Sequence, residues 1–367
     1  MKEQLAERLL ARVMDWDAEK VAQQRPVLQA LAAYKYDEYQ RFSPGQRFIE
    51  SLALWLSDFK TPEHKAAAYN FVRTRLVFFS AAEIQHLVSI AYPDHIRPLL
   101  LRRAAEELKL DPYHVGKVIA SPAFRALQRS CLFLGLSDGA RTDVFRRSNE
   151  DSVGHEQVLQ NYEIKAERVQ KLLDELRRDL RKLELGATDI DSATFNTIVL
   201  MDDFSASGTS YLRFEDEKLK GKLVEFSRDI KNPESAVAKL VNPKTRVFLI
   251  LYVATNQAVE HLKGLLSKHW GEQGIQFEIL VVHPLLPSIK IGPSDALEPL
   301  LDHYYDKAAL EDEHTEKGQH GVKFGYAACG LPVVLTHNTP NNSIYPLWAR
   351  SPKLRALFPR ISRHKRS

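Results

Sequence analysis

The chain has 367 residues, of which 44% are hydrophobic, enough to build a packed core and to fill two or three domains. Its 51 basic residues nearly balance its 47 acidic ones, and the formal net charge of +4 excludes the strongly basic surface of a dedicated nucleic-acid coat protein. Two isolated cysteines, Cys131 and Cys329, lack the paired spacing of a zinc site or a disulfide framework. No apolar run reaches the roughly 18 residues of a membrane span, so we expect a soluble, cytoplasmic protein without membrane contacts.

Residues 1–120 are expected to form an all-helical N-terminal region. Leu9 and Val13 are spaced as on one face of a helix, and the same periodicity returns at Leu52 and Leu56. We therefore predict helix after helix in this part of the chain.

Residues 121–350 are expected to form an α/β domain. Five short, almost continuous apolar runs are separated by segments long enough for helices, which is typical of a parallel sheet covered on both faces. The predicted strands are residues 131–136, 197–201, 246–253, 277–282 and 332–335.

Three further segments have distinct patterns. Apolar residues between positions 162 and 183 line one face of a long helix; packing against the sheet is favoured over a coiled-coil seam. Residues 212–243 form a charged stretch that contains Lys218, Lys220 and Lys222, and we predict an insertion there. Residues 351–367 are predicted to be a basic, solvated tail.

The segment Ile198–Ser210 has the strongest chemical signal. A buried strand ends in two carboxylates, Asp202 and Asp203, and is followed by a small turn that contains Gly208. Backbone N–H groups in such a turn can converge on an anion, and a helix beginning near Gly208 would add its dipole. Carboxylates at a strand's carboxyl end can hold ribose hydroxyls directly or through hydrated Mg²⁺. The alternative is an ordinary, well-capped strand-to-helix connection.

This stretch resembles the signature of the type I phosphoribosyltransferases, which implies a parallel sheet flanked by helices. In that family the acids hold the ribose hydroxyls of phosphoribosyl pyrophosphate with Mg²⁺, so the resemblance makes Asp202 and Asp203 the catalytic and metal-binding acids. It assigns the 5′-phosphate to Ser205, Ala206, Ser207, Gly208, Thr209 and Ser210. Two departures stand out: Ser205 replaces an apolar residue, and Ala206 supplies no general base.

A second loop follows the first predicted strand, where the family keeps its pyrophosphate loop. The resemblance assigns pyrophosphate binding to Ser137, Asp138, Gly139, Arg146 and Arg147, and a catalytic role to Arg141. Small residues expose backbone N–H groups and arginines neutralise phosphate charge, although such arginines also cap ordinary helices. The polar segment Ser148–Gly154 stands where the family has a mobile lid.

Amide side chains gather after the last predicted strand, within Thr336–Ser343. Asn338, Asn341 and Asn342 suit the base or acceptor side of a nucleotide site, although Asn and Pro also make ordinary turns.

The order of the helical region and these three loops resembles a divergent branch of the family found in bacterial conflict systems, including those linked to retrons. That branch implies a toxic effector in anti-phage defence, regulated by a partner such as a reverse transcriptase with its DNA or RNA. A homo-oligomeric state stays open.

Two functions follow. The first is an enzyme that binds Mg²⁺ with phosphoribosyl pyrophosphate or a nucleotide, and transfers or cleaves at C1 of the ribose. The second is a non-catalytic sensor of the same ligand that signals to a partner protein. The arginines of the second loop favour the enzyme, because a sensor needs no group for a departing pyrophosphate. Nucleic-acid binding through the basic tail and Lys218–Lys222 is a third, additional reading.

Overall fold

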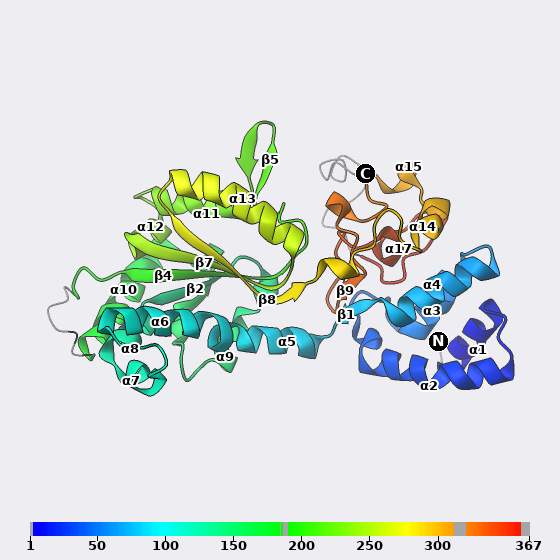
Figure 1. Ribbon diagram of the computed structural model, residues 1–367, viewed down its shortest axis with the longest axis horizontal. Helices are drawn as coiled ribbons and strands as arrows, with labels where there is room; N and C mark the ends of the chain where they lie inside the picture. Colours follow the sequence, from blue (N-terminus) through cyan, green and yellow to red (C-terminus); the bar gives the residue numbers. More distant parts are fainter. Residues whose placement is uncertain (1–2, 184, 186–189, 312–320, 361–367) are drawn as a thin grey trace. The chain divides into compact units, whose positions relative to one another are not determined.

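The computed structural model describes residues 3–183, 185, 190–311 and 321–360. The chain divides into two compact units (Figure 1). Unit 1 combines residues 1–83 with residues 286–367, and unit 2 is the continuous stretch 84–285 between them. Within the described ranges, no helix is long and apolar enough to cross a membrane.

Unit 2 contains four of the five predicted strands of the α/β domain, together with helices that precede the first of them. Helix α5 begins at the last residues of unit 1 and continues into unit 2. The helices and helical turns are α5 (Ala81–Ile90), the π-helical turn η2 (Ala91–Ile96), α6 (Arg97–Leu108), α7 (Val115–Ala120), α8 (Pro122–Arg129), η3 (Asp138–Ala140), α9 (Thr142–Ser148), η4 (His155–Gln157), η5 (Asn161–Glu163), α10 (Ala166–Arg181), α11 (Lys222–Lys231), α12 (Ala236–Leu240) and α13 (Asn256–Glu272). The strands are β2 (Cys131–Gly135), β3 (Val158–Gln160), β4 (Phe195–Ser205), β5 (Arg213–Glu215), β6 (Lys218–Lys220), β7 (Val241–Thr255) and β8 (Gln276–Leu285).

Five strands of unit 2 form one parallel sheet in the order β3-β2-β4-β7-β8. Four of the predicted strands are confirmed, while the short edge strand β3 was not predicted. Since β2 pairs with β4 on one side and with β3 on the other, the direction in which successive strands are added reverses at β2. In open parallel sheets ligands bind at the carboxyl ends of the strands beside such a reversal, here those of β2 and β4.

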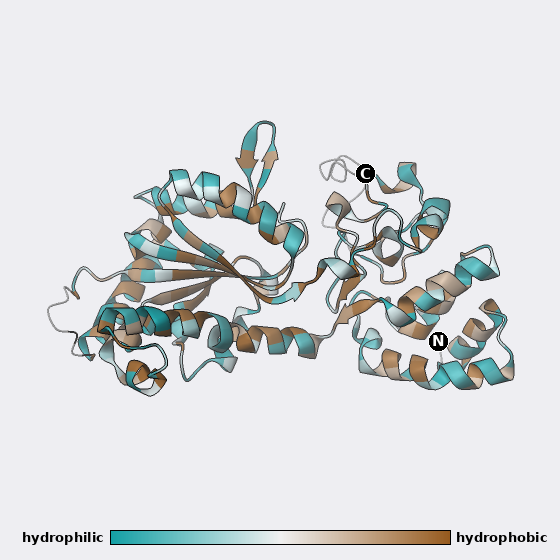
Figure 2. Ribbon diagram, viewed as in Figure 1, coloured by the Kyte–Doolittle hydropathy of each residue, from teal (hydrophilic) through white to brown (hydrophobic). Residues whose placement is uncertain are grey.

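Helices cover both faces of this sheet, as expected for buried parallel strands. Apolar residues of α10, α11, α12 and α13 form one core with alternate residues of β2, β4 and β7. On the opposite face, Phe133 of β2 packs against Tyr92 of η2 and Phe145 of α9. Figure 2 shows hydrophobic colour along the middle of the strands and hydrophilic colour over much of the helical surface. The α/β class with helices flanking a parallel sheet is confirmed.

Helix α10 confirms the packing interpretation of the apolar stripe. Val169, Leu173, Leu176 and Leu180 are buried in the core against the sheet rather than presented as a coiled-coil seam.

The segment 212–243 differs from a simple insertion. Its first part is the antiparallel hairpin β5–β6, which projects from the unit in Figure 1. Its second part, α11 and α12, belongs to the core, because Leu223, Phe226 and Leu240 are fully buried there. The segment is therefore a helical crossover between β4 and β7 that carries a hairpin.

Unit 1 joins the N-terminal helices to the C-terminal part of the chain in a single core. Its elements are α1 (Glu3–Val13), α2 (Ala18–Tyr34), η1 (Tyr36–Glu38), α3 (Phe48–Ser57), α4 (Pro62–Thr74), β1 (Val77–Phe79), η6 (Pro287–Ile289), α14 (Glu298–Tyr304), α15 (Lys307–Leu310), η7 (Tyr326–Ala328), β9 (Val333–Leu335) and α17 (Tyr345–Trp348). Strand β9 pairs in parallel with β1, so the predicted strand 332–335 is not part of the five-stranded sheet.

The boundaries of these units differ from those expected at 120 and 350. Helices α6 to α8 belong to the unit that holds the sheet, and residues 286–350 belong to the unit that holds the N-terminal helices. The expected tail also differs, because Leu357 and Phe358 are fully buried and Phe358 stacks on Phe48. Residues 361–367, the rest of that tail, lie outside the described residues.

Candidate functional site

The two acids of the motif lie near the carboxyl end of β4 but have different surroundings. Because side chains alternate along a strand, adjacent residues point to opposite sides. Asp202 is 2% exposed, whereas Asp203 is partly exposed. The pair therefore offers one buried and one accessible carboxylate.

Protein groups surround the Asp202 carboxylate completely. Its Oδ1 accepts hydrogen bonds from the Ser137 hydroxyl and from the backbone N–H of Asp203, 3.1 Å away. Its Oδ2 accepts from the Tyr211 hydroxyl at 2.8 Å and from the Lys222 ammonium at 2.7 Å. Two donors on each oxygen leave Asp202 as a fixed centre of the site.

The electrostatics of this cluster are dominated by burial. Burial raises the pKa of the Asp202 carboxyl, the neighbouring Asp203 acts in the same direction, and Lys222 opposes both. Burial, reinforced by the two acids, also holds the pKa of the Tyr211 hydroxyl well above its ordinary value. Tyr211 is therefore a hydrogen-bond donor to Asp202 at any physiological pH.

Mg²⁺ does not fit Asp202 in this arrangement. Mg²⁺ needs near-octahedral oxygen ligands at about 2.0–2.1 Å. The Oδ2 atom of Asp202 is already paired with the ammonium group of Lys222. Nor do the described residues contain a group of three His, Cys, Asp or Glu side chains able to hold a metal. The sequence-based expectation of Asp202 as a metal ligand is not supported by this geometry.

Asp203 lies against the loop that follows β2. A Cβ atom on Gly139 would be 2.5 Å from Cγ of Asp203, so only glycine leaves space for the carboxylate there. In the same loop, Ser137 reaches Asp202. The tertiary structure thus brings together the two loops that the sequence predicted separately, at the reversal between β2 and β4.

The turn after β4 is small and polar. Gly208 has φ +76, a left-handed conformation that favours glycine, and the hydroxyls of Ser207 and Thr209 lie 2.9 Å apart. Ser205 Oγ is buried and has no hydrogen-bond partner among the described residues. An unmatched buried hydroxyl in such a turn is a candidate donor to a ligand.

The expected helix does not begin at Gly208. Tyr211 and Leu212 both donate their N–H groups to the Gly208 carbonyl, and the chain then enters strand β5. The turn instead rests on α13, whose N-cap residue Thr255 donates to the carbonyl of Ala206 at 2.6 Å. The anion-binding capacity of the turn therefore depends on its own backbone and hydroxyls.

Arg141 ends the loop that follows β2, the same loop that carries Ser137 and Gly139. It adopts φ 46 and ψ 50, which is uncommon for a residue with a side chain, and it is the N-cap of α9. The adjacent Ala140 carbonyl accepts a hydrogen bond from Tyr252 at 2.7 Å. Burial, reinforced by both acids and opposed by Arg141, holds the pKa of that tyrosine well above its ordinary value. Unusual backbone conformations are frequent at ligand-binding sites.

The other two predicted arginines point elsewhere. Arg147 is 71% exposed and pairs with Asp143 at 2.6 Å along α9. Arg146 donates to the carbonyl of Val158 at the start of β3 and lines a cavity of about 460 Å³ with His155 and residues of α10. Their hydrogen bonds and ion pairs are thus made to α9 and β3, away from the turn after β4.

The segment Ser148–Gly154, expected as a lid, is anchored to its surroundings. Asn149 donates its amide to the Phe145 carbonyl at 2.8 Å, and Val153 is 1% exposed. Gly154 donates its N–H to Gln157.

This geometry agrees with the comparison against protein families. The model of the family PRTase-CE matches residues 52–360, most of the chain. The chain belongs to the PRTase-CE family. It is accordingly a phosphoribosyltransferase-like protein, and its parallel sheet flanked by helices is consistent with that fold. Searches of the curated proteins and of the solved structures gave no match.

The PRTase-CE match extends over both units, and the predicted amide cluster lies in unit 1. Asn342 donates to the carbonyl of Tyr326 and to the sulfur of Cys329, and the backbone carbonyl of Asn341 accepts from Tyr326. Asn338 caps its own turn by accepting from Thr339. These contacts hold the turns of unit 1 together, and the acids belong to unit 2.

Sequence reasoning missed Tyr211, Lys222 and Tyr252. Lys222 lies in a charged stretch of the kind found on protein surfaces. Tyr211 follows the turn that ends at Ser210, and Tyr252 lies within the predicted strand 246–253, so neither tyrosine belongs to a recognisable motif. One signal could have indicated such residues: a buried carboxylate needs hydrogen-bond donors, so donors had to lie near Asp202.

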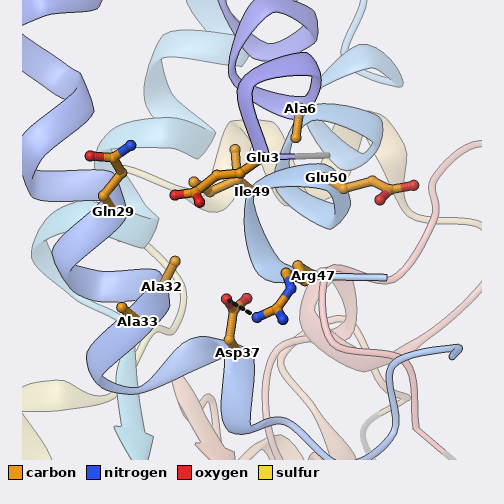
Figure 3. Close-up of a pocket in the computed structure, with 9 residues that line it drawn as sticks. All are labelled: Glu3, Ala6, Gln29, Ala32, Ala33, Asp37, Arg47, Ile49 and Glu50. Atoms are coloured by element: carbon orange, nitrogen blue, oxygen red, sulfur yellow. Dashed lines mark hydrogen bonds and ion pairs between the residues drawn. The ribbon is translucent and has the colours of Figure 1, made fainter. Parts of the chain in front are cut away.

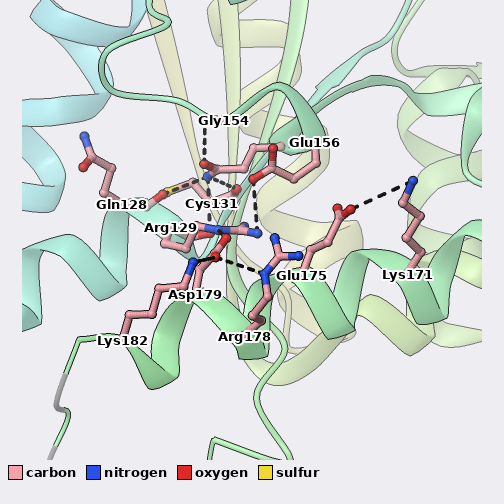
Figure 4. Close-up of polar contacts among 11 residues, drawn as sticks. Gln128, Arg129, Cys131, Gly154, Glu156, Lys171, Glu175, Arg178, Asp179 and Lys182 are labelled. Atoms are coloured by element: carbon pink, nitrogen blue, oxygen red, sulfur yellow. Dashed lines mark hydrogen bonds and ion pairs between the residues drawn. The ribbon is translucent and has the colours of Figure 1, made fainter.

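Two other polar groups of this PRTase-CE protein are separate from the acid pair. Arg129, shown in Figure 4, pairs with Asp179 at 2.9 Å and Glu156 at 3.2 Å, at the amino end of β2 and hence the opposite edge of the sheet. Unit 1 has a cavity of about 520 Å³. Arg47, one of its lining residues, pairs with Asp37 (Figure 3). The ion pairs of Arg129 connect structural elements of unit 2. The cavity of unit 1 is lined mainly by residues of α1, α2 and α3.

Proposed function

We propose that the protein binds phosphoribosyl pyrophosphate, or a nucleotide with the same ribose phosphate, at the carboxyl ends of β2 and β4. The observation that carries this proposal is the meeting of the two loops: Gly139 makes space for Asp203, and Ser137 holds Asp202. Family membership supports a ligand of this class.

Each part of the site has a proposed role. The accessible carboxylate of Asp203 accepts hydrogen bonds from the ribose hydroxyls. The turn Ser205–Ser210 binds the 5′-phosphate through backbone N–H groups and hydroxyls. Arg141 and the backbone of the loop at Ser137–Gly139 bind the pyrophosphate.

The proposed reaction is substitution at C1 of the ribose. The bond from C1 to the pyrophosphate oxygen breaks, the leaving pyrophosphate takes the electron pair, and an acceptor nucleophile forms the new bond while its proton passes to solvent. Arg141 stabilises the charge that develops on the leaving group. Because Ala206 offers no base, the acceptor must already be nucleophilic. In cleavage of a nucleotide, the bond from C1 to the base breaks, and the base takes the electron pair and a proton. Pyrophosphate as the nucleophile re-forms phosphoribosyl pyrophosphate, whereas water forms ribose 5-phosphate.

A sensor is the second candidate. The contacts that fix Asp202 and the anchored segment Ser148–Gly154 suit a site that binds without turnover. Binding and pyrophosphate release must therefore be measured separately.

The first test is calorimetric titration of phosphoribosyl pyrophosphate into the wild type and Asp203→Asn, with and without Mg²⁺. We expect the substitution to weaken binding by at least about tenfold, because a charged acceptor for two hydroxyls is lost. Asp216→Asn is the matched control, since Asp216 is 82% exposed and pairs with Lys220 in the hairpin.

Pyrophosphate release in the same samples distinguishes an enzyme from a sensor. A wild type that binds neither phosphoribosyl pyrophosphate nor a nucleoside monophosphate would refute the proposed site.

The biological role is a further part of the proposal. We propose an effector in anti-phage defence in the bacterial cytoplasm, regulated by a reverse transcriptase with its nucleic acid, on the basis of the resemblance given above. If the pocket carries the toxicity, the Asp203→Asn substitution also abolishes it in cells.

A further inference from the structure

Lys222 is the one cation that contacts the buried acid directly among the described residues. Its ammonium lies 2.7 Å from Asp202 Oδ2 and 5.3 Å from the centre of the Tyr211 ring. The Lys222 side chain is 32% exposed, so it approaches the buried carboxylate from the solvent side. Lys222 therefore occupies Oδ2 of Asp202 while part of its own side chain stays in contact with solvent.

The crossover that follows the hairpin fixes this position. Lys222 is the first residue of α11, and Gly221 before it has φ +124. A Cβ atom on Gly221 would collide with the carbonyl oxygen of Tyr211, so only glycine permits this approach. Leu223 donates its N–H to the same carbonyl at 3.1 Å and is fully buried. The backbone on both sides of Lys222 is thus tied to the turn after β4.

Two adjacent carboxylates need a compensating positive charge. In surroundings less polar than water, opposite charges in direct contact attract strongly, so the group that supplies the charge determines what else can bind. A divalent cation on Asp202 Oδ2 would lie beside the Lys222 ammonium and would have to displace it. The cation and the hydrogen bonds already present leave Asp202 no ligand position to offer.

We propose that Lys222 is the built-in cation of the acid pair and replaces a divalent metal at Asp202. Asp202 is then a positioning residue that holds the loop after β2 and the turn after β4 together, and the ligand meets Asp203. The identity of the ligand rests on the proposed function, whereas the exclusion of metal from Asp202 does not.

The test measures Mn²⁺ binding by electron paramagnetic resonance in the absence of any sugar phosphate. We expect Lys222→Met to bind Mn²⁺ about tenfold or more tightly than the wild type, because the variant removes the cation that pairs with Asp202 Oδ2. Adding Asp202→Asn to Lys222→Met should remove the gained site. Lys220→Met is the matched control, since Lys220 pairs with Glu215 and Asp216 outside the site, and it should behave as the wild type.

Two results would overturn the proposal. One is that the wild type binds Mn²⁺ and that the Asp202→Asn substitution abolishes this binding. This comparison needs no lysine variant. The other is a folded Lys222→Met, judged by circular dichroism, that gains no Mn²⁺ affinity. Lys222→Arg keeps the charge and should keep the wild-type exclusion of Mn²⁺. Failure of the proposed function appears differently, as a wild type without affinity for phosphoribosyl pyrophosphate, and leaves the Mn²⁺ comparison valid.

Discussion

At the scale of single residues, the adjacent side chains of Asp202 and Asp203 are chemically identical but have different surroundings. Asp202 has four donors and almost no exposed surface, and Asp203 has a glycine beside its carboxylate. A buried carboxylate is stable only with such donors. Asp203, which is partly exposed, is therefore the acid that we propose to meet the ligand.

Gly139→Ala tests this separation. The added Cβ must displace the Asp203 carboxylate, which is the movable end of a side chain, so we expect ligand affinity to fall about tenfold while the free energy of unfolding changes little. Calorimetric titration with phosphoribosyl pyrophosphate and thermal unfolding measure the two effects.

The control for this substitution is Gly116→Ala. A Cβ on Gly116 in α7 has no atom within 4 Å, so this variant should bind as the wild type does. If Gly139→Ala retains full affinity, Asp203 does not need its present position and its proposed role is wrong.

At the scale of elements, the start of α11 connects the crossover to the site. The helix core residues Leu223 and Phe226 anchor α11 on the sheet, and Gly221 sets the direction in which Lys222 leaves the chain. A packed helix thereby positions a charged group at a distant strand end, which sequence periodicity cannot indicate.

Gly221→Ala should disturb this connection. Its φ of +124 is a conformation almost restricted to glycine, and another residue there costs about 1–3 kcal/mol before the collision with Tyr211 is counted. We expect a lower free energy of unfolding in urea, together with the same gain in Mn²⁺ affinity as in Lys222→Met.

Gly264→Ala provides the comparison within a helix. Gly264 lies in the middle of α13 with no atom within 4 Å of an added Cβ, so alanine should stabilise the protein by about 0.5–1 kcal/mol. A Gly221→Ala variant as stable as the wild type would show that α11 tolerates another path.

At the scale of the whole molecule, unit 2 is inserted between the two parts of unit 1. Its sheet, its helices and all the residues proposed to bind the ribose phosphate lie within one continuous stretch. Domains of this size with their own core usually fold independently.

Residues 81–285, which include the whole of α5, should therefore fold alone and unfold cooperatively. The measurement is urea unfolding followed by circular dichroism. Leu176→Ala in this fragment should lower its stability by about 2–5 kcal/mol, since Leu176 is fully buried in the core of the unit. A fragment without a cooperative transition would mean that unit 1 is required for its folding.

The sequence by itself determined the α/β class, four strands of the main sheet, the core face of α10 and the motif that the two acids belong to. These features depend on local periodicity and on the order of residues along one strand and its turn, so they can be predicted without the fold. The resemblance at Ile198–Ser210 indicated the family to which the chain belongs.

Only the tertiary structure decided which of the two acids is buried, which side chains hold it, and where the units begin and end. Lys222 and Tyr211 reach Asp202 because a crossover folds back onto the strand end, and Arg147 turns away because it is on the outer face of α9. Likewise, β9 pairs with β1 across more than two hundred residues. Contacts between residues far apart in the chain follow from the packing of whole elements, and local sequence patterns carry no record of them.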